Sequence, residues 1–545
     1  MPETNANRLT AGSIPRQLIL FAIPTLASSM LQSAGGSIDS AWVGNLLGEA
    51  SLAATTNGNL VMFIMTSFVF GFGMAATILI GQSIGAGNLV QARRVVGTTA
   101  GSFVPAVLAL AIVGYFTAPY LLQLLGTAPE IIELARDYLK LTFVGLPAVL
   151  LQTILMMALR GSGDANTPLR FMLLAVILAT MLNPVFILGL GPLPAFGIGG
   201  SALALAASNY ISLAAMVVYI YRKDLPLRLR GEELRWLRPD PQLLKVMVTK
   251  GVPIGLQMII VTTAALTVLR IINGEGVNTI AAFGATQQLW TYVQMPAMAL
   301  AGAVSAMAAQ NIGAGRLDRV KRITRVGIGY NFLLTGGLIL LLSWLDRWAL
   351  GIFLTDSGDA MEIAIHIFQV ATWGFIAFGI SHVLFGTVRA AGQVIWPMVI
   401  LAVALYPVRL GAIHLLQPTL GSDAIWWSFP AAFIATMLMA MAYYLWGNWR
   451  QTHLVIDSAQ HRPKDSEYLI DEGPRVIEAP ASADPTQCVV CSGSERSPDQ
   501  SLNNRNDETL GATANRRCSK HSFTGAEAEA NTETKANAQM TEGYP

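Results

Sequence analysis

Residues 82–87 read Gln-Ser-Ile-Gly-Ala-Gly, and residues 310–315 repeat them as Gln-Asn-Ile-Gly-Ala-Gly, 228 residues later. A basic stretch follows each copy. Two further matches occur at an offset of 229 residues: Pro24 with Pro253, and Arg160, Gly163 and Pro168 with Arg389, Gly392 and Pro397. Three matches at nearly one spacing indicate that the chain consists of two related halves.

The composition places both halves in a membrane. Of the 545 residues, 53% are hydrophobic and only 12% are charged, whereas soluble domains carry roughly 25% charged residues. The apolar residues form long runs, as membrane spans do. The net charge of +2 gives no reason to expect a nucleic-acid partner.

Runs of about 20 apolar residues, the length that crosses a bilayer, predict twelve transmembrane helices. The first run is too long for a cleavable signal peptide and is expected to remain as a span. The predicted spans are 17–44, 51–78, 97–118, 131–157, 169–190, 198–221, 250–272, 278–308, 324–346, 361–388, 395–416 and 424–447. We therefore predict an all-α membrane protein with two six-helix bundles.

The boundaries of the predicted domains follow from these spans. Residues 1–221 form the N-terminal bundle, 222–249 a cytoplasmic linker, and 250–447 the C-terminal bundle. Residues 448–545 are rich in Ser, Asn, Asp, Glu and Thr and poor in aromatic residues, which is typical of a largely disordered tail.

Lys and Arg in the short loops predict that both termini are cytoplasmic. With that orientation, twenty basic residues face the cytoplasm, and the outer loops hold only Arg136, Lys140 and Arg347. Because six is an even number, both halves enter the membrane from the same side, so that an axis along the membrane normal relates them. Two such bundles enclose a cavity that rocking opens to alternate sides, which indicates a transporter.

Asp39 is the candidate coupling residue. It lies late in the first span, and a carboxylate within the membrane usually faces a cavity or carries a function. Burial favours the neutral form of a carboxyl group, which would let Asp39 carry a proton. The alternative is an acid at the outer membrane interface. At an offset of 229 the second half has Val268, so that the coupling site would belong to the first bundle only.

Other polar residues within the spans could share the pocket of Asp39 or simply join helices by hydrogen bonds. They are Asn57, Asn59, Asn183, Ser208 and Asn209. The eighth span holds candidates for the lining of a substrate cavity, because Met and aromatic side chains adapt to varied apolar ligands; packing between helices is the alternative. These are Gln288, Trp290, Tyr292 and Met295. Arg409, deep in the eleventh span, is a further candidate for this lining, because it needs a partner, a water-filled cavity or a route to the outer surface; capping of backbone carbonyls is the alternative.

Four tail residues have metal-ligating side chains. Cys488, Cys491, Cys518 and His521 form a CxxC…CxxH pattern that could hold a tetrahedral zinc ion, although the long intervening loop and the polar surroundings argue against it. No metal or cofactor is predicted for the membrane region.

The motifs together resemble the multidrug and toxic compound extrusion (MATE) family over about residues 10–447. They are Ala22-Ile23-Pro24 through Asp39 and Val43-Gly44, the two Gln-x-Ile-Gly-Ala-Gly elements, Arg160-Gly161-Ser162-Gly163-Asp164 with Pro168, Gly189-Leu190-Gly191-Pro192, and Met295-Pro296. The resemblance implies a V-shaped pair of six-helix lobes that export cationic, aromatic compounds in exchange for H⁺ or Na⁺, with Asp39 as the protonation site.

One departure from the family pattern bears on the coupling ion. Many members carry a second acid before a proline in the fifth helix, where this chain has Asn183 before Pro184. Some Na⁺-coupled members have acids in the seventh and tenth helices, and no Asp or Glu occupies the interior of either span predicted there. The resemblance therefore implies the DinF-like branch and proton coupling, with Na⁺ as the alternative.

We expect a monomeric efflux antiporter in a bacterial-type inner membrane, with a small-molecule substrate and the lipid bilayer as its partners. A flippase for lipid-linked precursors is the first alternative, and it would need a more cationic cavity than Arg409 provides. A membrane-embedded enzyme is the second. It would need clustered acids, histidines or a metal motif within the spans, and the sequence shows none.

Overall fold

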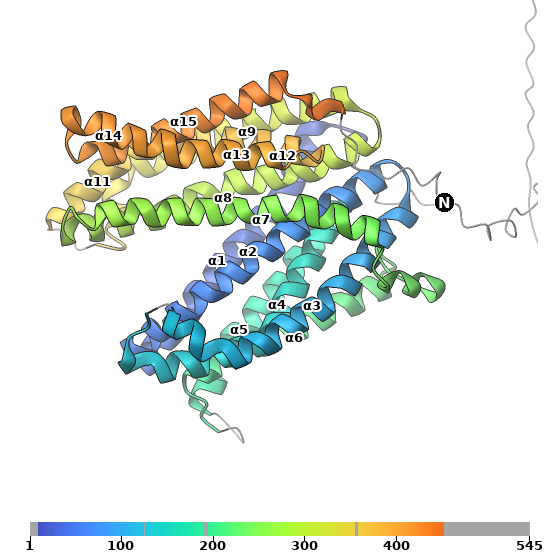
Figure 1. Cartoon of the computed structure of the whole chain (residues 1–545), viewed down its shortest axis with the longest axis horizontal. Coiled ribbons are helices and arrows are strands. Elements are labelled where there is room, and N and C mark those ends of the chain that lie inside the picture. Colours follow the sequence, from blue (N-terminus) through green and yellow to red (C-terminus); the bar gives the residue numbers. More distant parts are fainter. Residues whose placement is uncertain (1–8, 125, 190–193, 355–357, 452–545) are drawn as a thin grey trace, which may run out of the picture. The chain divides into compact units, whose positions relative to one another are not determined.

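Residues within hydrocarbon must satisfy their backbone hydrogen bonds internally, so the long apolar runs fold as helices. The computed structural model describes residues 9–124, 126–189, 194–354 and 358–451, without the side chains of Asn57, Leu60 and Gln451. All of these residues lie in one structural unit. Within it, the helices form two bundles that are close at one end and diverge toward the other (Figure 1).

In its described residues, the first bundle contains six long helices and one short 3₁₀ turn. These are α1 (Ile14–Leu47), α2 (Glu49–Gly85), α3 (Leu89–Leu124), η2 (Pro129–Ile131), α4 (Ile132–Gly161), α5 (Asn166–Leu188) and α6 (Ile198–Arg222). The 3₁₀ segment η3 (Gly231–Leu237) connects this bundle to the second.

The second bundle has the same number of spans, but two of them are interrupted. Its elements are α7 (Pro241–Ile272), α8 (Val277–Gly313), α9 (Leu317–Trp344), α10 (Asp346–Leu350), α11 (Asp359–Ala371), α12 (Gly374–Ala390), α13 (Ile395–Val403), the π-helical turn η4 (Ala404–Val408), α14 (Arg409–Leu420), α15 (Asp423–Trp446) and η5 (Asn448–Gln451). Among the described residues, eleven helical segments are long and apolar enough to span a membrane, and the bent pair α11 and α12 supplies the twelfth.

Two predictions need correction. The span predicted at 361–388 is not one straight helix, because α11 and α12 meet at a bend of 46°. The linker predicted at 222–249 is shorter, because α7 begins at Pro241. Asp240 caps this helix, its Oδ1 accepting a hydrogen bond from the backbone N–H of Gln242 at 2.9 Å. Asp before Pro at the first helical position is a strong start signal.

The helices α1 and α7 each contact both bundles. The first half of α1 packs through Leu18 and Phe21 against Val304 and Met307 of α8. Its second half packs on α5, where Gly35 faces Val176. In the same way, α7 packs its first half on α2 of the first bundle and places its end in the core of the second. In each bundle, the first half of the first helix therefore packs against the other bundle.

The repeated motifs meet where the bundles are close. Gln82 donates a hydrogen bond to the carbonyl of Ala390 at 2.7 Å, and Gln310 donates one to the carbonyl of Gly161 at 3.0 Å. Because Gly161 and Ala390 correspond at the 229-residue offset, the two bonds form a symmetric pair across the interface of the bundles. The sequence repeat is thus also a structural repeat.

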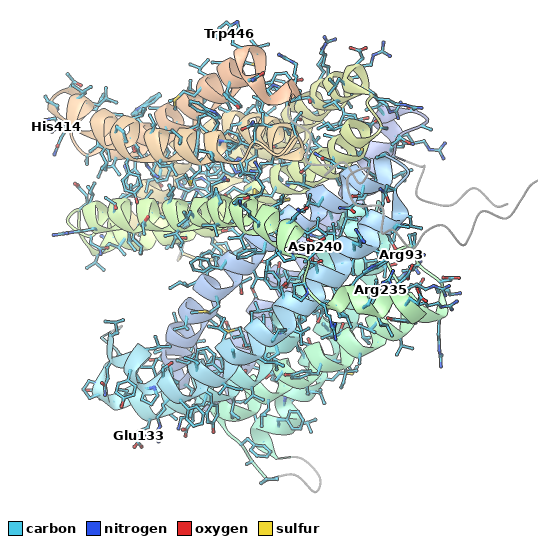
Figure 2. The ribbon with its side chains drawn as sticks, turned by 45° about the vertical axis from the view of Figure 1, so that its right-hand side comes forward. Arg93, Glu133, Arg235, Asp240, His414 and Trp446 are labelled. Carbon is cyan, nitrogen blue, oxygen red and sulfur yellow. The ribbon has the colours of Figure 1, made fainter. Side chains whose placement is uncertain are left out.

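Titratable side chains lie at both ends of the unit. Figure 2 shows Arg93, Arg235 and Asp240 at one end, and Glu133 and His414 at the opposite end. At the first end, Arg93 forms an ion pair with Glu233 of η3 at 2.6 Å, which attaches the connecting segment to α3.

Candidate functional site

Asp39 lies in the second half of α1, inside the first bundle. Only 6% of its surface is exposed. A charged carboxylate buried in this way is costly unless hydrogen bonds compensate for the lost water. The neighbouring helices α5 and α6 supply those bonds.

Two side chains donate hydrogen bonds to the same oxygen of Asp39. The hydroxyl of Ser201 on α6 donates to Oδ1 at 2.7 Å, and Nδ2 of Asn183 on α5 donates to it at 3.0 Å. Both donors are almost fully buried. Charge-assisted hydrogen bonds such as these stabilise the ionised carboxylate, so the site can hold the charged form of Asp39.

A tyrosine extends this cluster toward α2. Tyr138 of α4 is within electrostatic range of Asp39, and its hydroxyl donates a hydrogen bond to Oδ1 of Asn59 at 3.2 Å. Its ring packs directly on Gly58, where an added Cβ would lie 2.6 Å from the ring. The cluster therefore contains residues of α1, α2, α4, α5 and α6.

The structure separates the predicted polar residues into two groups. Asn183 contacts Asp39, and Asn59 joins the cluster through Tyr138. Ser208 and Asn209 instead hydrogen-bond to backbone carbonyls one turn earlier in α6, those of Ala204 and Leu205. The hydrogen bonds of these two side chains therefore lie within α6 and do not involve Asp39. The side chain of Asn57 lies outside the described part of the chain.

Sequence reasoning missed Ser201 and Tyr138. Ser201 lies in the first turn of the predicted sixth span, at the outer end, and Asp39 lies toward the outer end of the first. A comparison of depth along the spans could have paired them. Tyr138 gives no such signal, because one tyrosine near a helix start resembles an interfacial anchor.

The second bundle has no counterpart of Asp39. Val268 occupies the corresponding position and is 1% exposed, within an apolar cluster formed with Ile272, Leu289 and Trp290. Trp290 itself is 2% exposed and donates a hydrogen bond from Nε1 to Thr372 at 2.8 Å, so this predicted cavity residue belongs to the core of the bundle. Gln288 and Met295 are half-buried, and Tyr292 is exposed.

Arg409 lies directly after the π-helical turn η4 and is 5% exposed. Its guanidinium lies 3.7 Å from the ring centre of Phe429, a cation–π contact that partly compensates for burial. Its Nε and Nη2 have no hydrogen-bond partner among the described residues. Of the membrane-embedded residues predicted from sequence, Arg409 is therefore the least well compensated.

Within residues 9–451, leaving out the undescribed positions, no three His, Cys, Asp or Glu side chains form a group that could hold a metal ion. The zinc pattern predicted from Cys488, Cys491, Cys518 and His521 lies outside the described residues.

Comparison with known proteins identifies relatives of both halves. The family model named MatE matches twice, at residues 24–185 and 253–412, and the two matches begin at Pro24 and Pro253, the pair found in the repeat.

Two curated relatives come from Bacillus subtilis (strain 168). The probable multidrug resistance protein YoeA is 34% identical over 447 residues, which cover 81% of this chain and 96% of that protein. The probable multidrug resistance protein YpnP is 29% identical and covers 82% of this chain and 98% of its own length. A crystal structure of a MATE mutant matches with a TM-score of 0.73 at 20% identity, over 82% of this chain and 98% of that one.

Proposed function

This chain belongs to the MatE family of multi-pass membrane transporters, and on that premise we propose that it exports small cationic or aromatic compounds in exchange for protons, with Asp39 as the protonation site. The names of the two Bacillus subtilis relatives, each a probable multidrug resistance protein, support efflux of varied compounds. The chain is a transporter and not an enzyme.

The buried carboxyl of Asp39 is the observation that carries the proton-coupling proposal. In its ionised form it accepts hydrogen bonds from Ser201 and Asn183. A proton on Oδ1 would weaken both bonds, because a neutral acid is a poorer acceptor than a carboxylate. Protonation thus changes how firmly α1 is held against α5 and α6.

The hydrogen-bond directions favour H⁺ over Na⁺. Both neighbours direct an N–H or O–H group at Asp39, whereas a sodium ion needs several oxygen lone pairs directed at one point. The carboxyl oxygens of the cluster come from Asp39 alone, since the position before Pro184 is an amide. The two donors therefore satisfy the ionised carboxylate without a metal ion, and a proton needs only the one carboxyl group that the cluster holds.

The course of α1 supports coupling between proton and substrate. Its first half packs against α8 of the second bundle, and its second half carries Asp39 within the first. A change in how α1 packs near Asp39 therefore alters a helix that both bundles contact. Alternating access then follows when the bundles rock about the contacts of the repeated motifs.

We also propose that the protein acts as a monomer in a bacterial-type inner membrane, with both termini in the cytoplasm. The basic residues support this orientation, since Arg93 and Arg235 lie at the end opposite Glu133 (Figure 2). The end at which the repeated motifs meet would then face the cytoplasm.

Transport by the purified full chain in sealed liposomes tests the proposal. With an acidic lumen and Na⁺-free buffer, a permanently charged aromatic dye should accumulate inside. Asp39→Asn keeps the size and hydrogen-bonding capacity of the side chain but cannot exchange a proton, so accumulation should fall to the level of empty liposomes. Asp137→Asn makes the same chemical change at an exposed acid and should transport normally.

The other outcomes are also informative. Accumulation by Asp39→Asn at the parent rate would remove Asp39 from the coupling step. Accumulation driven by a Na⁺ gradient without a pH gradient, and lost in Asp39→Asn, would replace the proton by sodium.

A further inference from the structure

A basic cavity lies between the start of α1 and the first turns of α9. Its volume is about 430 Å³, and its lining consists of Gly12, Ser13, Ile14, Pro15, Arg319, Arg322, Arg325 and Val326. The first four residues come from α1 and the segment before it, and the last four come from α9.

The three arginines present their charges on one face of α9, because residues three apart in a helix are neighbours on its surface. The lining of the cavity includes no acidic side chain. Arg322 and Arg325 are exposed and form no ion pair with the residues that the structure describes. The nearby Asp318 pairs with Lys321 instead, at 3.5 Å. The positive charge of the cavity is therefore not neutralised from within.

Arg319 forms the fixed wall of this cavity. Its Nη2 donates hydrogen bonds to the carbonyl of Gly12 at 2.9 Å and to Oε1 of Gln17 at 3.2 Å. Its Nε is buried and has no partner among the described residues. The opposite wall is the positive end of α1, a helix of 34 residues with no acid in its first turn.

Exposed apolar side chains follow residues of the cavity lining by seven positions, about two helical turns, along both helices. Leu20 of α1 is 59% exposed, and Phe332 and Leu333 of α9 are 58% and 66% exposed. These residues follow the arginines toward the middle of the predicted spans, at a depth where lipid covers such side chains. The arginines of the cavity can bind an anion, and the exposed side chains beyond them can contact an apolar chain. This combination suits an amphipathic anion.

We propose that this cavity binds the phosphate group of an anionic phospholipid, whose acyl chains lie along α1 and α9. Guanidinium groups bind phosphate oxygens with directed, charge-assisted hydrogen bonds, and basic pockets between membrane helices suit lipid headgroups. A lipid bound there holds the start of α1 against α9. This proposal concerns binding and stands apart from the coupling role of Asp39.

Native mass spectrometry of the full chain, taken from mixed vesicles of phosphatidylcholine and phosphatidylglycerol, tests the proposal by counting retained lipids. The double variant Arg322→Gln, Arg325→Gln removes two charges from the cavity and no hydrogen bond that the structure shows. Because each charge near a lipid surface contributes on the order of 1 kcal/mol, retention of phosphatidylglycerol should fall by about tenfold or more. The control, Arg222→Gln with Lys223→Gln, removes two exposed charges from the end of α6 and should retain it.

Melting temperatures distinguish a loss of lipid binding from a loss of folding. In pure phosphatidylcholine, both double variants should have the melting temperature of the parent. Added phosphatidylglycerol should raise the melting temperature of the parent and the control only. Equal loss of lipid in both double variants would show a general surface-charge effect and overturn the proposal, as would a parent that retains no phosphatidylglycerol. Stabilisation of the detergent-solubilised parent by inorganic phosphate, to the same extent as by the lipid, would assign the cavity to free phosphate and overturn the lipid assignment.

Discussion

Ser201 and Asp39 lie 162 residues apart in the sequence, and the hydroxyl of one donates a hydrogen bond to the carboxylate of the other at 2.7 Å. This bond stabilises the charged form of Asp39. We expect Ser201→Ala to let Asp39 keep its proton up to a higher pH, and the midpoint of pH-dependent transport to rise by about one to two pH units, since a hydrogen bond to a charged group contributes about 1.5–3 kcal/mol.

The matched control for that variant is Ser208→Ala. Ser208 lies on the same helix and is also fully buried, but its hydroxyl donates to the carbonyl of Ala204. Its pH profile should match that of the parent. A profile of Ser201→Ala that is also unchanged would show that the hydroxyl does not act on the titrating group.

Asn183→Asp would place a second carboxyl group beside Asp39, because Nδ2 of Asn183 lies 3.0 Å from Oδ1 of Asp39. Two carboxyl groups at this separation cannot both ionise easily, so the pair should share a proton over a wide pH range. Transport measured against pH should then persist to higher pH and change over a broader interval. A profile identical to that of the parent would mean that the two side chains do not interact during transport.

Gly313 lies where the bundles are in closest contact. A Cβ atom at this position would lie 1.9 Å from the backbone oxygen of Gln82. Gly313→Ala should therefore destabilise the protein by about 1–3 kcal/mol and lower its melting temperature. Gly302→Ala, on the same helix where a Cβ meets nothing within 4 Å, should leave the melting temperature unchanged. Equal melting temperatures for the two variants would contradict the close contact of the motifs.

Replacement by methionine should affect thermal stability differently at Arg409 and at Arg389. Arg409 has two buried nitrogen atoms without hydrogen-bond partners, so Arg409→Met should melt at the same temperature as the parent or higher. Arg389 donates a hydrogen bond to Oε1 of Gln257, and Arg389→Met would leave that oxygen without this donor, at a cost of about 1–3 kcal/mol. Thermal melting in one detergent compares them, and a large loss of stability in Arg409→Met would show that its guanidinium has a partner in solution.

Transport by Arg409→Met gives a separate readout. If stability is kept and transport falls, Arg409 acts in the cycle of the transporter and not in folding. If both stay at the parent level, the predicted role of Arg409 in lining a substrate cavity is wrong.

The amino-acid sequence determined the class of fold. Apolar runs of bilayer length leave the backbone no alternative to helices, and the matched motifs at 82–87 and 310–315 required two similar halves. The position of Asp39 within a span, and its absence from the second half, were also readable from the chain alone, because both depend only on order along the sequence.

Tertiary structure decided which side chains meet. Asn183 and Ser208 were equal candidates by sequence, yet only Asn183 contacts Asp39. Ser201 was missed, and Trp290 proved to be core. Helix periodicity fixes the face on which a residue lies, but not which helix packs against that face or how deep each one sits. Those choices depend on packing between segments far apart in sequence, including the exchange of α1 and α7 between the bundles.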